Sequence, residues 1–312
     1  MKPEILQIVP MLPSVEAALG QAYVVHRYWQ APDPAALLAE AGPRIRAVAT
    51  DGHHGVAPEI MAALPKLEIV ASYGVGYDNI DTAACKARGV RATNTPDVLN
   101  DAVAELAIGL MIALCRRIPQ ADAHVRAGRW PSAGFPLTAE LTGAHAGILG
   151  LGRIGKEIAR RLQAMKMRVS YHGRREQPFE PYPWYPDLEA MARDVDWLVV
   201  IAPGTTATRG IVSRQVMRAL GPEAALVNVA RGALVDEPAM VELLASGALG
   251  GAALDVFADE PRVPDALLAM PNVVLSPHQG SATHKTRAAM GDLVVRNLAA
   301  HFAGDPLLTP VA

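Results

Sequence analysis

The chain has 312 residues, of which 51% are hydrophobic and 19% charged, and its formal net charge is -2 at pH 7. This length and apolar content suffice for one large or two ordinary domains with proper cores, and they exclude a disordered chain. Acidic and basic residues are interspersed, which excludes the basic surface of a nucleic-acid-binding protein and the polybasic patch of a membrane-surface protein.

The two cysteines, Cys85 and Cys115, stand far apart in the sequence. This excludes a disulfide framework and a cysteine-based zinc site, and it suits a reducing compartment. The first residues carry a proline and an acid where a signal peptide has an apolar run, and no stretch approaches the roughly 18 apolar residues of a membrane span. We therefore expect a soluble, cytoplasmic protein with no membrane partner.

Short apolar runs alternate with helical patterns from the start of the chain. The predicted strands are 5–9, 23–25, 47–49, 69–72 and 90–92, and the predicted helices are 34–41, 58–64 and 82–87. Alternation of this kind is typical of a parallel sheet covered on both faces.

The longest helical pattern, 102–117, is apolar almost all round, and a second helix is predicted at 120–127. A helix with so little polar surface must be buried on most sides. We expect this region, around 101–127, to be a linker between domains and the interface of a homodimer.

The stretch 147–155, GILGLGRIG, joins an apolar run to a helical pattern and so indicates a strand, a tight turn and a helix. In this GxGxxG turn, Gly150 lets the backbone turn, Gly152 leaves room for a pyrophosphate, and Gly155 lets the helix pack closely on the strand. A diphosphate would bind the free N–H groups at the start of the helix. We therefore predict a dinucleotide site here.

The next predicted strand, 167–171, is followed by His172-Gly173-Arg174-Arg175 and lacks the acidic residue that holds the ribose hydroxyls of NAD. Two guanidinium groups there can bind a 2′-phosphate through charge-assisted hydrogen bonds, whereas a carboxylate would repel it. We therefore predict NADP(H) rather than NAD(H). The alternative is a solvated basic loop that binds nothing.

The same alternation continues to the end of the chain. Further strands are predicted at 197–201, 225–229, 252–256 and 273–275, further helices at 188–193, 213–220 and 238–246, and a long helix at 285–302. This makes a second domain of six strands, after which the long helix returns to the first domain. We expect an α/β protein with two doubly wound parallel sheets: a Rossmann-type dinucleotide-binding domain, 99–284, inserted into a flavodoxin-like substrate domain, 1–98 plus 285–312.

Three strand ends of the second domain carry ionisable residues beside turn-forming residues: Arg231, Glu260 and His278. Because parallel strands end at one edge of a sheet, these groups would meet beside the cofactor. A guanidinium can hold a carboxylate, an imidazolium can protonate an oxygen as hydride arrives, and a carboxylate can orient the imidazole. Each residue alone could be a surface ion pair, a loop carboxylate or a cap, but together they suit the reduction of a 2-oxo acid.

These motifs resemble those of the D-isomer-specific 2-hydroxyacid dehydrogenase family over essentially the whole chain. In that family the arginine of Asn-Val-Ala-Arg-Gly, the glutamate of Asp-Glu-Pro and the histidine of Pro-His-x-Gly-Ser are catalytic, and they match Arg231, Glu260 and His278. The arginine pair and the ending PLLTPV at 306–311 are most similar to the NADPH-dependent glyoxylate/hydroxypyruvate reductases, including hydroxyphenylpyruvate reductases. The resemblance implies NADPH-dependent reduction of glyoxylate, hydroxypyruvate or a related 2-oxo acid to the D-2-hydroxy acid.

The resemblance also implies the binding residues. Backbone N–H groups of Val75 and Gly76 would bind the substrate carboxylate together with Arg231, and Asp255 would hold the nicotinamide carboxamide. The predicted cofactor contacts are Gly150, Leu151, Gly152, Arg153, Ile154, Gly155, Gly173, Arg174, Arg175, Ala202, Pro203, Thr208, Val229, Ala230, Arg231, Asp255, His278 and Gly280.

The chain departs from the family pattern at Tyr73 and Tyr77, where smaller residues are common, and at Gln279, where an apolar residue is usual. These departures leave the pocket for the substrate side chain open. His53 or His54 could contact substrate, although a solvated loop position is the simpler interpretation. We expect no metal site, because the presumed chemistry needs none.

Two further roles stay open. Trp130 could reach the pocket of a partner subunit or simply anchor the interface. Arg287 could bind substrate, although a helix-surface ion pair is the simpler expectation.

The alternative function is that of a dinucleotide-sensing corepressor of the same fold, in which cofactor occupancy controls the binding of a partner. The complete catalytic set and the lack of extra tails argue against it.

Overall fold

The computed structural model describes residues 2–311 and divides into two compact units. One unit holds the residues up to Leu99 and those from Ser281 on, and the other is Asn100–Gly280. The predicted changes of domain, after residue 98 and at residue 285, lie near these positions. The assignment of the two units to substrate and cofactor stays a prediction.

The first unit is built on a five-stranded parallel sheet in the order β2-β1-β3-β4-β5. Its strands are β1 (Glu4–Gln7), β2 (Val24–Arg27), β3 (Ile45–Thr50), β4 (Ile69–Ser72) and β5 (Arg91–Thr93). This order, 2-1-3-4-5, is the flavodoxin-like arrangement that the sequence predicted. The inner strands are buried except at Glu4 in β1 and Arg46 in β3, as expected for a sheet covered on both faces.

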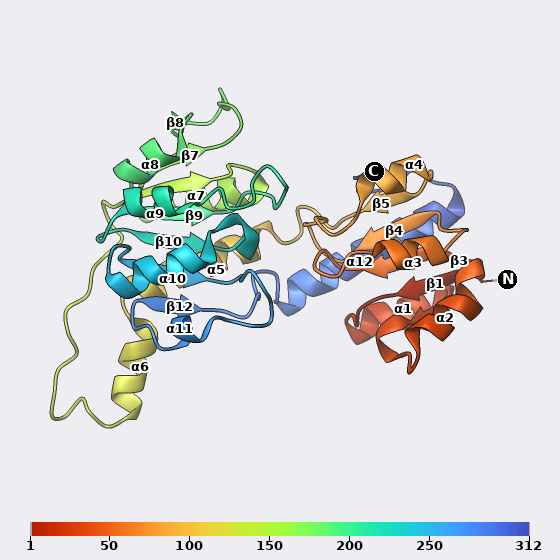
Figure 1. Ribbon diagram of the computed structural model, residues 1–312, viewed down its shortest axis with the longest axis horizontal. Helices are drawn as coiled ribbons and strands as arrows, with labels where there is room; N and C mark the ends of the chain where they lie inside the picture. The colour runs from red at the N-terminus through yellow and green to blue at the C-terminus, as the bar shows by residue number, and fades with distance from the viewer. Residues whose placement is uncertain (1, 312) are drawn as a thin grey trace. The chain divides into compact units, whose positions relative to one another are not determined.

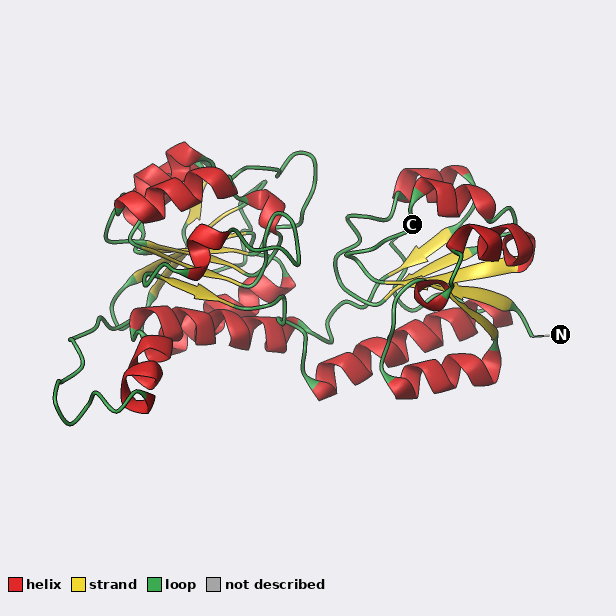
Figure 2. Cartoon of the chain, turned by 60° about the horizontal axis from the view of Figure 1, so that its bottom comes forward, coloured by secondary structure: helices red, strands yellow, loops and turns green. Residues whose placement is uncertain are grey.

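Helices cover both faces of this sheet (Figure 2). They are α1 (Pro13–Ala22), α2 (Pro34–Ala41), α3 (Pro58–Ala63), α4 (Thr82–Ala87) and α12 (His284–Ala303), with short 3-10 turns at Tyr28–Gln30 and Gly42–Arg44. The first three α-helices begin with proline in the first turn, where its fixed φ is favourable. The sequence prediction lacked α1. The long C-terminal helix α12 packs on α1 and β4, and so returns to the first unit.

The second unit contains a seven-stranded parallel sheet in the order β12-β11-β10-β9-β6-β7-β8 (Figure 1). Its strands are β6 (His145–Leu149), β7 (Arg168–His172), β8 (Trp184–Tyr185), β9 (Trp197–Val200), β10 (Ala225–Asn228), β11 (Gly251–Leu254) and β12 (Val273–Leu275). Counted from β6, the order is 3-2-1-4-5-6-7, which extends the Rossmann order by one strand. The prediction of six strands was wrong, because it lacked β8, a strand too short to show an apolar period.

The helices of the second unit also lie on both faces of their sheet (Figure 2). They are α5 (Asn100–Cys115), α6 (Ile118–Arg126), α7 (Arg153–Ala164), α8 (Leu188–Asp194), α9 (Arg214–Leu220), α10 (Glu237–Ser246) and α11 (Asp265–Leu268), with a 3-10 turn at Gly232–Leu234. Side chains of Asp187, Ser213 and Asp236 cap α8, α9 and α10. The apolar helix α5 packs on α7 and on the β10–β12 side of the sheet, which explains much of its apolar surface.

Candidate functional site

The turn between β6 and α7 has the geometry that a dinucleotide requires. Gly150 has a φ of +102°, and a Cβ atom there would lie 2.8 Å from the backbone of Ala202. A Cβ atom on Gly155 would lie 2.3 Å from the carbonyl oxygen of Gly150, so the helix approaches the turn at a distance that only glycine allows. At Gly152, by contrast, a Cβ atom would meet no described atom within 4 Å. The open space at Gly152, in front of Arg153 and Ile154 in the first turn of α7, therefore fits a diphosphate.

This turn lies where the strand order of the sheet reverses. Strand β6 has β7 on one side and β9 on the other, and open parallel sheets bind ligands at such a point. Ala202 and Pro203 follow β9 here. The hydroxyl of Thr208 donates to the Pro203 carbonyl at 2.7 Å and accepts from the Thr205 N–H at 2.9 Å, so it shapes the turn after β9. Nucleotide contact by these residues stays a prediction.

The basic pair follows the end of β7. Arg174 and Arg175 are both exposed, and β7 itself ends in His172 rather than in an acid. The Trp184 indole N–H donates to the Gly173 carbonyl at 3.2 Å, which holds the start of this loop against β8. Two guanidinium groups are thus displayed at one edge of the sheet, on the side of the glycine turn.

The turn after β10 is shaped by Asn228. Its amide nitrogen donates to the Arg231 carbonyl at 2.9 Å, and its amide oxygen accepts from the Ala230 N–H at 3.1 Å. Val229 and Ala230 are buried, and the Arg231 guanidinium donates to the Ala230 carbonyl at 2.7 Å. Asn228 therefore sets the backbone that carries the predicted catalytic arginine.

The turns after β10 and β11 are in contact. A Cβ atom on Gly232 would lie 2.0 Å from the carbonyl carbon of Phe257, so these two backbones approach as closely as glycine permits. The N–H of Phe257 in turn donates to Oε1 of Glu260 at 3.0 Å. Arg231 and Glu260 thus stand on adjoining turns.

Asp255, 1% exposed, joins the end of β11 to the loop after β12. Its carboxylate accepts from the Ser276 hydroxyl at 2.5 Å and from the N–H groups of Gln279 and Gly280, each at 2.9 Å. Its backbone carbonyl accepts from the His278 N–H at 2.8 Å. His278 itself has a φ of +50°, an uncommon conformation for a residue with a side chain. The hydrogen bonds to Asp255 therefore hold the loop in which His278 has this positive φ.

Glu260 and His278 form the pair that the sequence predicted. Oε2 of Glu260 lies 2.6 Å from Nδ1 of His278, and their side chains are 16% and 41% exposed. A carboxylate on Nδ1 fixes the orientation of the ring and leaves Nε2 to face another group. Within residues 2–311, Nε2 of His278 makes no hydrogen bond or ion pair. The pair is thus arranged to hold or transfer one proton at Nε2.

The predicted carboxylate-binding loop, with Val75 and Gly76, lies in the first unit after β4. The Asn94 amide donates to the Val75 carbonyl at 2.9 Å, and the Thr95 N–H donates to the Gly74 carbonyl at 2.9 Å. Both bonds use carbonyl groups of the loop. Binding of a substrate carboxylate by the N–H groups of Val75 and Gly76 stays a prediction.

The loop of His53 and His54 adjoins the same segment, because a Cβ atom on Gly52 would lie 2.1 Å from the Gly76 carbonyl oxygen. The Asp51 carboxylate accepts from the His54 N–H at 2.7 Å and lies 3.0 Å from its Nδ1. His54 is exposed and lies beside a carboxylate, so a solvated loop position remains the simpler interpretation.

Arg287 also differs from the simpler expectation. Its guanidinium lies over the ring of Tyr73, with Cζ 5.6 Å from the ring centroid, and its carbonyl accepts from the Tyr73 hydroxyl at 2.8 Å. Burial raises the pKa of that hydroxyl, so it stays protonated as a donor.

Residues 108–280 match the family model described as D-isomer specific 2-hydroxyacid dehydrogenase, NAD binding domain. This span includes the glycine turn and the strand ends of the second unit described above. The chain belongs to the D-isomer specific 2-hydroxyacid dehydrogenase family.

Named relatives of this dehydrogenase align along nearly its full length. A hydroxyphenylpyruvate reductase of Plectranthus scutellarioides is 48% identical over 307 residues, covering 98% of each chain. A glyoxylate/hydroxypyruvate reductase of Arabidopsis thaliana is 47% identical with the same coverage. An NADPH-dependent glyoxylate/hydroxypyruvate reductase of Sinorhizobium meliloti, solved with NADP and malonate, is 45% identical with a TM-score of 0.94, covering 100% of this chain and 97% of that chain. These reductases favour an enzyme over the corepressor alternative.

Sequence reasoning missed the polar residues that shape this dehydrogenase's strand-end turns. Asn228 and Ser276 follow apolar runs and are buried, at 1% and 4% exposure. A buried amide or hydroxyl must find hydrogen-bond partners. A polar residue at the end of an apolar strand, as Asn228 in β10, or directly after it, as Ser276 after β12, was therefore the available signal.

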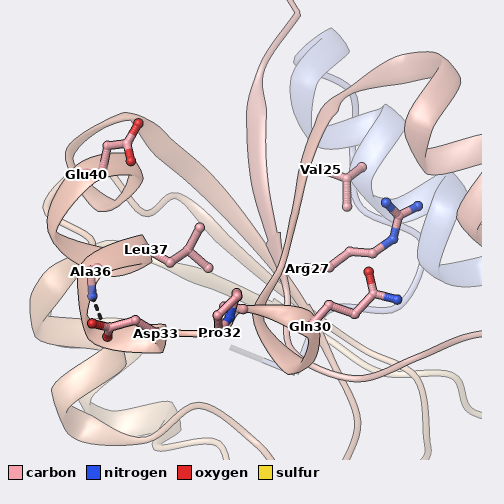
Figure 3. A pocket seen from close by; sticks show the side chains of 9 residues that line it. Val25, Arg27, Gln30, Pro32, Asp33, Ala36, Leu37 and Glu40 are labelled. Carbon is pink, nitrogen blue, oxygen red and sulfur yellow. Dashed lines mark hydrogen bonds between the residues drawn. The ribbon is translucent and has the colours of Figure 1, made fainter.

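A surface hollow of about 470 Å³ in the first unit contains none of the predicted site residues (Figure 3). It lies between β2 and α2, and its Asp33 carboxylate caps α2 by accepting from the Ala36 N–H at 3.0 Å. Arg27 on its wall lies 3.5 Å from Glu16. Asp33 and Arg27 thus have structural partners.

Within residues 2–311, no helix of the dehydrogenase combines the length and the apolar character needed to cross a bilayer.

Proposed function

We propose that this dehydrogenase reduces glyoxylate, hydroxypyruvate or a related 2-oxo acid to the D-2-hydroxy acid with NADPH. The observation that carries the proposal is the Glu260–His278 pair at a strand end of the unit that contains the glycine turn. The names of its relatives, glyoxylate/hydroxypyruvate and hydroxyphenylpyruvate reductases, support this substrate class.

His278 is the proposed proton donor. NADPH supplies a hydride when bound, and the carbonyl carbon of the substrate receives it. The carbonyl oxygen takes the proton from Nε2 of His278, which completes the alcohol and leaves the imidazole neutral. Glu260 on Nδ1 holds the ring in position, so that Nε2 faces the substrate.

The proposed binding groups are a guanidinium and backbone amides. Arg231, on the turn that Asn228 shapes, binds the substrate carboxylate and polarises its carbonyl group. Val75 and Gly76 in the first unit are the proposed amide donors. Asp255 accepts three hydrogen bonds from the loop after β12 and keeps further lone-pair capacity for a carboxamide N–H.

The proposed preference for NADPH depends on Arg174 and Arg175, which can pair with a 2′-phosphate. The bound NADP in the S. meliloti reductase supports this preference. The open space at Gly152 fits the diphosphate. We also propose a cytoplasmic location, since both cysteines are free and buried.

The experiment is a turnover panel. Glyoxylate, hydroxypyruvate, pyruvate and hydroxyphenylpyruvate are each assayed with NADPH and with NADH, and KM and kcat are measured for the wild type. We expect turnover with at least one of these acids and a lower KM for NADPH than for NADH. Equal or better use of NADH would overturn the cofactor preference.

The same panel is run with His278→Gln, for which we expect kcat to fall by about 10²- to 10⁴-fold while NADPH affinity changes little. His284→Gln is the matched control, because His284 is exposed at the start of α12 and has no assigned role. An unchanged kcat for His278→Gln would refute the assignment of the proton donor.

A further inference from the structure

The loop that carries the basic pair is tied to the glycine turn by Gln177. This loop leaves β7, passes through Arg174 and Arg175, and returns as β8 at the edge of the sheet (Figure 1). Three residues after Arg174, the Gln177 amide nitrogen donates to the carbonyl oxygen of Leu151 at 2.7 Å. Leu151 stands between Gly150 and Gly152, so this bond joins the two segments predicted to bind the two ends of one cofactor.

The backbone of Gln177 is fixed as well. Its N–H donates to the hydroxyl of Tyr171 at 2.6 Å, and Tyr171 is 1% exposed within β7. Its carbonyl accepts from the Glu180 N–H at 3.1 Å. The Glu180 carboxylate then lies 2.7 Å from Nζ of Lys156 in the first turn of α7. The loop is thus held on both sides of Gln177, whereas the arginine side chains before it are exposed.

We propose that Gln177 is a positioning residue that sets the Arg174–Arg175 loop at the distance from the glycine turn that NADPH requires. This inference rests on the proposed function. In NADPH the diphosphate and the 2′-phosphate are covalently joined through one ribose, so groups that bind both must stand at a matching separation. A loop already held at that separation loses little conformational entropy on binding.

The consequence is selective. Removing the Gln177 bond lets the loop move, and ordering it again then weakens the binding of any ligand with a 2′-phosphate. NADH and adenosine 5′-monophosphate lack that phosphate and gain nothing from an ordered arginine pair. A residue with a merely structural role would affect both kinds of ligand alike.

The test uses Gln177→Met, which keeps the length of the side chain and removes its N–H donor. Calorimetry measures the Kd of adenosine 2′,5′-bisphosphate and of adenosine 5′-monophosphate, and kinetics measure KM and kcat with NADPH and NADH. We expect the bisphosphate Kd and the NADPH KM to rise roughly 3- to 10-fold, as for the loss of one hydrogen bond. We expect the monophosphate Kd, the NADH KM and both kcat values to stay within about twofold.

Gln163→Met is the matched control. Gln163 lies on α7, and its side chain reaches the Tyr182 hydroxyl of the same loop at 3.4 Å. Among residues 2–311 its side chain makes no hydrogen bond to the glycine turn, so both Kd values should stay unchanged. Gln177→Asn, which shortens the side chain by one methylene and keeps its polarity, should show the same selective loss as Gln177→Met and serves if that variant does not fold.

The outcomes separate this inference from the proposed function. Equal weakening of both probes in Gln177→Met, or no weakening of either, overturns the role of Gln177 while the wild type still prefers NADPH. A wild type that binds the two probes equally overturns the NADPH preference itself.

Discussion

At the scale of single residues, the glycine turn shows how one motif holds glycines of different kinds. Gly150 and Gly155 are required by the fold, because a side chain at either position would collide with backbone atoms. Gly152 is not required by the fold, since a Cβ atom added there would enter open space and its φ of -82° suits any residue. The sequence motif alone does not distinguish these roles. In the proposed function, the lack of a side chain at Gly152 leaves space for the diphosphate of the cofactor.

We therefore predict that Gly152→Ala and Gly155→Ala fail in different ways. Gly152→Ala should keep the unfolding temperature of the wild type, while the Kd for NADPH rises at least tenfold because a methyl group enters the diphosphate space. Gly155→Ala should lower stability by about 1–3 kcal/mol, because its methyl group would overlap the Gly150 carbonyl. Thermal melts and fluorescence titrations measure both effects. Normal NADPH affinity in Gly152→Ala would contradict the proposed diphosphate site.

At the scale of elements, the C-terminal helix is joined to its sheet by a charged cluster. The Arg46 guanidinium in β3 binds both carboxylate oxygens of Glu68, at 2.6 and 2.9 Å, and Nε2 of His301 in α12 lies 2.9 Å from Oε2 of the same carboxylate. The Arg46 guanidinium also lies over the ring of Phe302, 5.0 Å from its centroid. Hydrogen bonding to Arg46, and to a lesser extent to His301, lowers the pKa of Glu68 below its ordinary value of 4.5.

A carboxyl group whose pKa is lowered by folding stabilises the folded state at pH values above its ordinary pKa. This stabilisation is lost as the pH falls through the pKa that the group has in the folded state. We predict that Glu68→Gln is less stable than the wild type at pH 7, by at most about 1 kcal/mol because the Glu68 side chain is 37% exposed and solvent screens the pair. The difference should shrink as the pH falls below 4.5.

Urea unfolding at pH 7, 5 and 3.5 measures this difference. Glu40→Gln, at an exposed position near the end of α2, is the control and should match the wild type at each pH. A gap between Glu68→Gln and the wild type that stays constant with pH would rule out this explanation.

At the scale of the whole molecule, exposed apolar side chains gather along one stretch of the second unit. Ile118 and Val125 on α6 are 48% and 53% exposed, and Trp130 and Leu137 in the segment after it are 67% and 100% exposed. Large apolar side chains grouped in this way mark protein–protein contact surfaces. We propose that α5, α6 and this segment form a homodimer interface, with Trp130 as an aromatic anchor.

We predict that the wild type sediments at twice the mass of one chain. The double variant Val125→Glu/Leu137→Glu should shift towards the monomer, since charges on an apolar interface are costly to bury. Phe179→Glu is the control and should leave the dimer intact. Phe179 is 96% exposed in the loop between β7 and β8, and β8 lies at the opposite edge of the sheet from β12, just before which Pro271 bonds to α6. A wild type that sediments as a monomer at micromolar concentration would overturn the interface.

The sequence by itself predicted most of the sheet architecture, because apolar periodicity and glycine patterns are local signals. Strands β4 and β12 and helices α2 and α4 have their predicted bounds. The sequence also predicted the GxGxxG turn, the missing acid after β7 and the ionisable residues at the strand ends. Parallel strands end at one edge of a sheet regardless of the length of the loops between them. Helix α1 and strand β8 were not predicted, and β8 has only two residues, too few to show an apolar period.

Only the tertiary structure decided which of these residues touch. The bonds from Glu260 to His278, from Asp255 to the 276–280 loop and from Gln177 to Leu151 join segments 18 to 26 residues apart along the chain. Such contacts depend on how loops close over a packed sheet and leave no period in the sequence. Local chemistry therefore determined which groups are present at the strand ends, and packing between distant segments determined how they are paired.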